Sequence, residues 1–156
     1  MTVESRGLVL LVDSKIAFRQ EAEEAFVAAG FRVVTSANSM EAIDRLGGME
    51  TPDLLVTRAR MPRGNPSGFG LAWIARYGRP GLRIVLHTDS DNCLTPKEVA
   101  NAPGTVLSKV THGRELVEAV ETDFSEKASG NASDRQQFEL RPAAYKSFSQ
   151  RRTEVP

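Results

Sequence analysis

The fold is constrained most by a strict alternation of short apolar runs and helical patterns over residues 1–121. The runs are rich in Val, Leu and Ile, and several are apolar at successive positions. Such runs are typical of strands that are buried on both faces of a parallel sheet. The predicted strands are Leu8–Val12, Phe31–Thr35, Leu54–Thr57, Arg83–His87 and Thr105–Leu107.

Each predicted strand is followed by a helical pattern with recognisable ends. The first carries an apolar stripe at Phe18, Ala22 and Phe26, and Gly30 follows it as a stop signal. The fourth begins at Thr95-Pro96 and has Glu98 at its third position, which are the residues of a capping box with proline at N1. The other helices are predicted from Asn38 to Gly48, over Phe69–Tyr77 and from about Thr111.

Strict alternation of strands and helices implies right-handed crossovers, and therefore a parallel sheet with helices on both faces. With five strands, the favoured arrangement is the flavodoxin-like order 2-1-3-4-5. The predicted fold is an α/β, doubly wound three-layer sandwich formed by residues 1–121.

The remaining residues, 122–156, are predicted to be a polar linker and a basic tail. The stretch SEKASGNASDRQQ is polar and rich in Ser and Ala, as linkers are. Residues 135–152 hold five basic residues and one acidic residue, with aromatic residues among them. Two interpretations remain open: a disordered tail, or a short docking element, which could be a helix, that folds back or binds a partner.

Charge and cysteine content exclude several classes of protein. Lys plus Arg equals Asp plus Glu at 20 each, so the overall charge favours neither nucleic acid nor an anionic membrane. The tail offers one basic cluster without a fold to present it, so no nucleic-acid partner is expected. A single cysteine cannot form an intramolecular disulfide, and the first apolar run is too short to span a membrane. The predicted location is the cytoplasm, with no membrane contact.

Polar residues follow four of the predicted strands. Asp13 follows the first, Arg58 the third, Thr88 the fourth and Lys109 the fifth. In an open parallel sheet, ligands collect outside the carboxyl ends of the strands. The four side chains are therefore predicted to converge on one site.

These residues lie in motifs that resemble the CheY-like receiver domain of bacterial response regulators. The motifs are VLLVDS, PDLLVTRARMP, IVLHT and VLSK, in the order and spacing of that family over about residues 7–121. The resemblance implies an acidic pair for magnesium after the first strand and an aspartate after the third that accepts a phosphoryl group. It also implies a Thr or Ser and a Lys that contact the phosphoryl oxygens, positions that Thr88 and Lys109 match.

The sequence departs from this pattern at the residues that carry the chemistry. Arg58 stands three residues before Met61-Pro62, at the position of the phosphoacceptor, and Ser14 stands in place of the second acid. Val106 replaces the switch aromatic, and Val110 replaces the proline that often follows the lysine, so a cis peptide is not expected there.

Arg58 cannot do the work of the residue that it replaces. A guanidinium has five donors and no acceptor, so it cannot take a phosphoryl group as a carboxylate does, and it repels magnesium. We therefore expect no phosphoacceptor, no metal, no cofactor and no catalytic residue. Arg58 is predicted to pair with Asp13 in bidentate fashion, or with Asp89. The alternatives are an Arg58 that extends to solvent and a pocket that holds an anion beside Lys109. His87 is given a structural role.

The leading functional prediction is a degenerate receiver that acts without phosphorylation and is not an enzyme. It would be a protein-interaction module in bacterial two-component-type signalling. Its partner would be a histidine kinase, another regulator or a second copy, through a surface near Val99, Val106 and Arg114. The alternative is a sensor of a small anion or ligand that uses the strand-end pocket.

Overall fold

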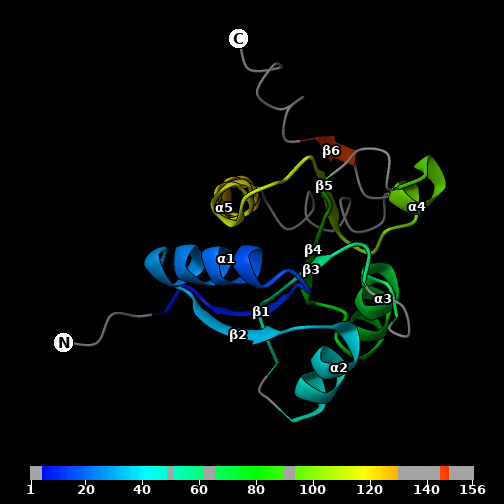
Figure 1. Cartoon of the computed structure of the whole chain (residues 1–156), viewed down its shortest axis with the longest axis horizontal. Coiled ribbons are helices and arrows are strands. Elements are labelled where there is room, and N and C mark those ends of the chain that lie inside the picture. The colour runs from blue at the N-terminus through cyan, green and yellow to red at the C-terminus, as the bar shows by residue number, and fades with distance from the viewer. Residues whose placement is uncertain (1–4, 49–50, 62–65, 90–93, 130–144, 148–156) are drawn as a thin grey trace.

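A computed structural model describes residues 5–48, 51–61, 66–89, 94–129 and 145–147 of the chain (Figure 1). Strands and helices alternate as predicted over most of it. The strands are β1 (Leu8–Val12), β2 (Arg32–Ser36), β3 (Leu54–Arg58), β4 (Arg83–His87), β5 (Thr105–Ser108) and β6 (Tyr145–Ser147). The helices are α1 (Ile16–Ala28), α2 (Ser39–Gly48), α3 (Gly68–Gly78), α4 (Pro96–Ala100) and α5 (Gly113–Ser129).

The strands form one sheet in the order β2-β1-β3-β4-β5-β6, and every pair is parallel. The predicted order 2-1-3-4-5 is confirmed for the first five strands. The sixth strand was not predicted. It comes from the C-terminal segment and lies beside β5, with Tyr145, Lys146 and Ser147 opposite Val106, Leu107 and Ser108.

Helices cover both faces of the sheet, with α1 and α5 on one side and α2 and α3 on the other (Figure 1). Alternate residues of β1 face opposite sides of the sheet. Val9 and Leu11 pack with α1 and α5, whereas Leu10 and Val12 pack with α2 and α3. All five residues of β1 are buried. Burying each such side chain stabilises the fold by about 1.5–3 kcal/mol, so the central strands hold the sheet together.

Local signals set the helix boundaries where the sequence predicted them. The stripe of α1 is buried at Phe18, Ala22 and Phe26. The capping box of α4 is formed, since Thr95 Oγ1 accepts from the Glu98 N–H and the Glu98 carboxylate accepts from the Thr95 N–H. These contacts satisfy amide groups that the first helical turn leaves without partners.

Two expectations need correction. The edge strand β2 is only partly buried, because an edge strand has one neighbour and is covered incompletely. The boundary predicted at residue 121 lies inside α5, which continues to Ser129. The rest of the predicted tail lies outside the described residues, apart from β6. None of the described helices has the length and hydropathy that a bilayer span requires.

Candidate functional site

The predicted site residues follow strands that run parallel. Their chain positions therefore lie at the same end of the sheet, where the carboxyl ends of the strands meet. Asp13 follows β1, Arg58 ends β3, Thr88 follows β4 and Lys109 follows β5. Tight packing fixes the end of β3: a Cβ at Gly68 would overlap the carbonyl oxygen of Arg58. Only glycine therefore allows α3 to begin this close to β3.

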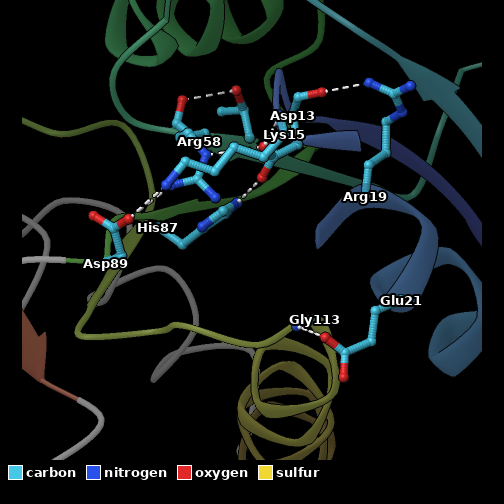
Figure 2. A network of polar contacts seen from close by, with 9 residues as sticks. Asp13, Lys15, Arg19, Glu21, Arg58, His87, Asp89 and Gly113 are labelled. Carbon is cyan, nitrogen blue, oxygen red and sulfur yellow. Dashed lines mark hydrogen bonds and ion pairs between the residues drawn. The ribbon is translucent and has the colours of Figure 1, made fainter. Parts of the chain in front are cut away.

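Arg58 and Asp13 form a buried ion pair (Figure 2). Arg58 Nε donates to Asp13 Oδ1 at 2.9 Å, and the exposed fractions of the two side chains are 8% and 0%. The same Oδ1 accepts from the backbone N–H of Lys15 at 2.8 Å. Arg19 Nη1 donates to the backbone carbonyl of Asp13 at 2.7 Å. Asp13 is thereby held by three neighbouring residues.

Arg58 also approaches Asp89, the other predicted partner. Its Nη1 lies 3.7 Å from Asp89 Oδ2, and Lys15 Nζ lies 2.8 Å from the same oxygen. Arg58 therefore contacts two carboxylates through different nitrogens, and the predicted bidentate pair with Asp13 is not formed. The guanidinium links the ends of β1, β3 and β4 instead.

Sequence reasoning missed the part that His87 and Phe18 have in this site. His87 lies opposite Arg58 in the β3–β4 register and is fully buried. Its ring stacks on Phe18, with centroids 4.9 Å apart and an interplanar angle of 14°. Arg58 Cζ lies 5.0 Å from the centroid of the same Phe18 ring, within cation–π range. Parallel register is the signal that could have placed His87 beside Arg58.

His87 also contacts the carboxylate of Asp13. Its Nε2 lies 3.3 Å from Asp13 Oδ2, although the two groups are not aligned as a hydrogen bond. Burial lowers the pKa of His87, and the nearby Asp13 carboxylate only partly opposes that effect. Burial alone would raise the pKa of Asp13, but His87 and Arg58 outweigh it and lower that pKa below its ordinary value. At neutral pH Asp13 is thus a carboxylate beside the Arg58 guanidinium.

The remaining predicted residues follow β1, β4 and β5 in the chain. Ser14 is half-buried and Thr88 is buried. The Thr88 backbone bridges to β5, donating to Leu107 O and accepting from Val110 N. Lys109 is exposed and has φ 60°, a left-handed conformation that costs a lysine about 1 kcal/mol or more. The described residues contain no cis peptide bond, so the Lys109–Val110 bond is trans.

The three residues named for the predicted partner surface lie in different environments. Val99 and Val106 are buried in the core, because β5 and α4 turn these side chains inward. Arg114 is exposed, but it lines a different region, the groove of about 460 Å³ between α1 and α5. The three residues do not form one surface.

The site does not fit a magnesium ion. The acid after β1 already accepts from Arg58 Nε and from the Lys15 amide, and a cation there would face the guanidinium. Magnesium needs several oxygen ligands in octahedral geometry. Within the described residues, no group of three or more His, Cys, Asp and Glu side chains could hold a metal ion.

The arrangement of strands and helices is the fold of the receiver domains of two-component response regulators. The chemotaxis response regulator CheY4 of Vibrio cholerae superposes with a TM-score of 0.63 at 23% identity, covering 74% of this chain and 96% of CheY4. The signal receiver domain of an HD domain-containing protein from Pseudomonas fluorescens Pf-5 gives 0.64 at 21% identity, covering 80% and 99% of the two chains.

A third solved structure is the response regulator TrrA from Thermotoga maritima in complex with Mg²⁺-BeF, with a TM-score of 0.61 and 23% identity. It covers 74% of this chain and 96% of TrrA. No protein-family model and no curated protein matches the sequence. At these identities the similarity establishes a CheY-like fold, and function has to be argued from the site.

Proposed function

We propose that the chain is an atypical, phosphorylation-independent receiver-like module that mediates protein–protein interaction in bacterial two-component-type signal transduction. The observation that supports this most directly is the buried Arg58–Asp13 ion pair at the strand ends. Arg58 is the residue at the position where the resembled family has its phosphoacceptor.

Three properties of the pair oppose phosphoryl transfer. Arg58 offers no oxygen nucleophile and remains cationic at physiological pH. Asp13 is engaged by Arg58 and by the Lys15 amide. A cation that captured Asp13 would have to break a buried ion pair, which costs about 3–5 kcal/mol when one partner is left without the other. The metal and the acceptor are thus disfavoured by the same side chain.

The same contacts favour a single conformation of the strand ends. Arg58 joins Asp13 and Asp89, and Lys15 also binds Asp89, so the ends of three strands are tied by charge. In this proposal no phosphoryl group changes the charge of the site between two signalling states. The partner would be a histidine kinase, another regulator or a second copy, bound in the cytoplasm without any catalytic step.

A sensor of a small anion is the second candidate, and the charges at the site support it less well. Arg58 and Lys15 would be the obvious cationic ligands, but both already contact carboxylates. An anion would have to compete with Asp13 and Asp89 for these donors. Calorimetric titration with phosphate and with sulfate tests this candidate, which predicts saturable binding that Arg58→Met abolishes.

Intact-mass measurement tests the proposed loss of phosphorylation. The full chain is incubated with acetyl phosphate and magnesium, beside a receiver domain that is known to phosphorylate under the same conditions. We expect no phosphoryl adduct on the full chain and a clear adduct on the control. A hydroxylamine-sensitive adduct on an aspartate of this chain would refute the proposal.

Sedimentation velocity tests the interaction part of the proposal when the partner is a second copy. The distribution of species should be the same with and without acetyl phosphate and magnesium. For a kinase partner, the same comparison is made by titrating the kinase's phosphoryl-transfer domain into the labelled chain. An affinity that depends on the phosphodonor would contradict independence from phosphorylation.

A further inference from the structure

The edge of β5 is covered by a strand from the chain's own C-terminal segment. β6 lies parallel to β5 and closes that side of the sheet (Figure 1). Residues 130–144 connect α5 to β6, so the two strands that pair are far apart in sequence. An edge strand presents a row of backbone donors and acceptors that can pair with any extended segment.

Backbone alternation defines which groups of β5 face this edge. The carbonyl of Leu107 accepts from Thr88 N, so the polar backbone groups of Leu107 point toward β4. Neighbouring residues of a strand point their backbone groups to opposite sides. The N–H and C=O groups of Val106 and Ser108 therefore point away from β4 and toward β6.

The register then assigns the pairing residue of β6. Lys146 lies opposite Leu107. In a parallel ladder, a residue opposite Leu107 donates its N–H to the carbonyl of residue 106 and accepts from the N–H of residue 108. Lys146 is thus the residue whose backbone faces β5, and the N–H of Ser147 faces away from it.

We propose that the β5 edge is a strand-docking surface whose resident occupant is the chain's own segment Tyr145–Ser147. An extended peptide of a partner docks there, in parallel and through main-chain hydrogen bonds, only by displacing β6. Because β6 belongs to the same chain, its pairing with β5 is intramolecular, so a free peptide competes poorly with it. This inference concerns the β5 edge and does not rest on the proposed function of the Arg58 site.

Hydrogen exchange of the Ser108 amide in the full chain tests the proposal, followed by NMR or by mass spectrometry with fragmentation. Lys146→Pro removes the donor to Val106 and should speed Ser108 exchange by about tenfold, since two paired groups open to water. Ser147→Pro is the matched control, because its missing N–H faces away from β5. Lys146→Ala keeps the backbone, so both controls should exchange like the wild type.

Three results of the exchange experiment would overturn the proposal. One is a Ser108 amide that exchanges as fast in the wild type as in Lys146→Pro. Another is equal acceleration by both proline variants. The third is protection that rises with protein concentration together with a dimeric mass in light scattering, because the occupant would then be the strand of a second copy. The Leu107 amide, which faces β4, should stay slow in all variants and reports that each is folded.

A synthetic peptide of residues 138–152 tests docking in trans. At millimolar concentration it should slow Ser108 exchange in the Lys146→Pro chain and leave the wild-type chain unchanged. The same peptide carrying Lys146→Pro should have no effect. If the first peptide fails to protect Ser108, the edge does not accept a strand and the proposal is wrong.

Discussion

Replacing Arg58 by Met should destabilise the chain strongly at neutral pH and much less at acid pH. The change leaves Asp13, whose side chain is 0% exposed, without its guanidinium partner. A buried carboxylate in this position can lose its unpaired charge only by taking up a proton. Starting from the ordinary pKa of 3.8, protonating Asp13 at pH 7 costs about 4 kcal/mol. This cost is the largest loss of stability that the unpaired carboxylate can cause.

This maximum loss of stability becomes smaller as the pH is lowered. At pH 5 protonation costs only about 2 kcal/mol, so the deficit of Arg58→Met relative to the wild type should shrink by roughly half. The sign follows from the unpaired Asp13, whose pKa in the folded variant should lie above the unfolded value. Its penalty is then fully present above the folded pKa and decreases as the pH falls from that pKa toward the unfolded value.

Urea denaturation followed by far-UV circular dichroism at pH 7 and pH 5 measures the effect. Arg60→Met is the matched control, since Arg60 makes a 2.8 Å ion pair with Glu98 in which both side chains are substantially exposed. Surface pairs of this kind contribute about 0–1 kcal/mol. The double variant Arg58→Met with Asp13→Asn should be more stable than Arg58→Met alone at pH 7. A loss below about 1 kcal/mol for Arg58→Met, or one that does not vary with pH, would refute the reasoning.

Three further predictions concern the contacts around the site. Because burial lowers the pKa of His87 from 6.5, the unfolded chain binds a proton that the folded chain does not bind as the pH falls through 6.5. The free energy of unfolding from urea denaturation should then drop by up to about 1.4 kcal/mol per pH unit, and His87→Gln should flatten this slope. Gly68→Ala should cost more than about 2 kcal/mol by thermal denaturation, because its Cβ overlaps the Arg58 carbonyl, whereas Gly78→Ala, with open space around it, should cost no such amount. Thr95→Ala removes the cap of α4 and should cost about 1 kcal/mol; a loss near zero by the same melt would contradict the capping assignment.

The sheet could be predicted because its strands carry a strong local signal. A strand covered on both faces must be apolar at successive positions, and Leu8–Val12 shows this pattern in the sequence as it does in the burial of β1. The strand β6 could not be predicted in this way. It spans three residues in a polar segment, and its pairing depends on the exposed edge of β5 rather than on its own composition.

Part of the site could be predicted from the sequence for a geometric reason. Asp13 and Arg58 end neighbouring parallel strands, so topology alone brings them near each other. The sharing of Arg58 between Asp13 and Asp89, and the stacking of Phe18 on His87, depend on side-chain conformations that spacing does not specify. The family position of Val106 predicts a surface residue, whereas a residue inside a covered strand is buried.

The central claim is that Arg58 occupies the place of the metal and the phosphoacceptor, and a titration of the ¹⁵N-labelled full chain with magnesium and then beryllofluoride tests it most directly. We expect no saturable shift of the Asp13, Arg58 and Thr88 amides. The variant Arg58→Asp with Ser14→Asp, which restores the acidic residues, is the control and should gain a magnesium-dependent shift. Saturable shifts of these amides in the wild-type chain would show that the pocket still accepts a metal and a phosphoryl analogue, and would contradict the account.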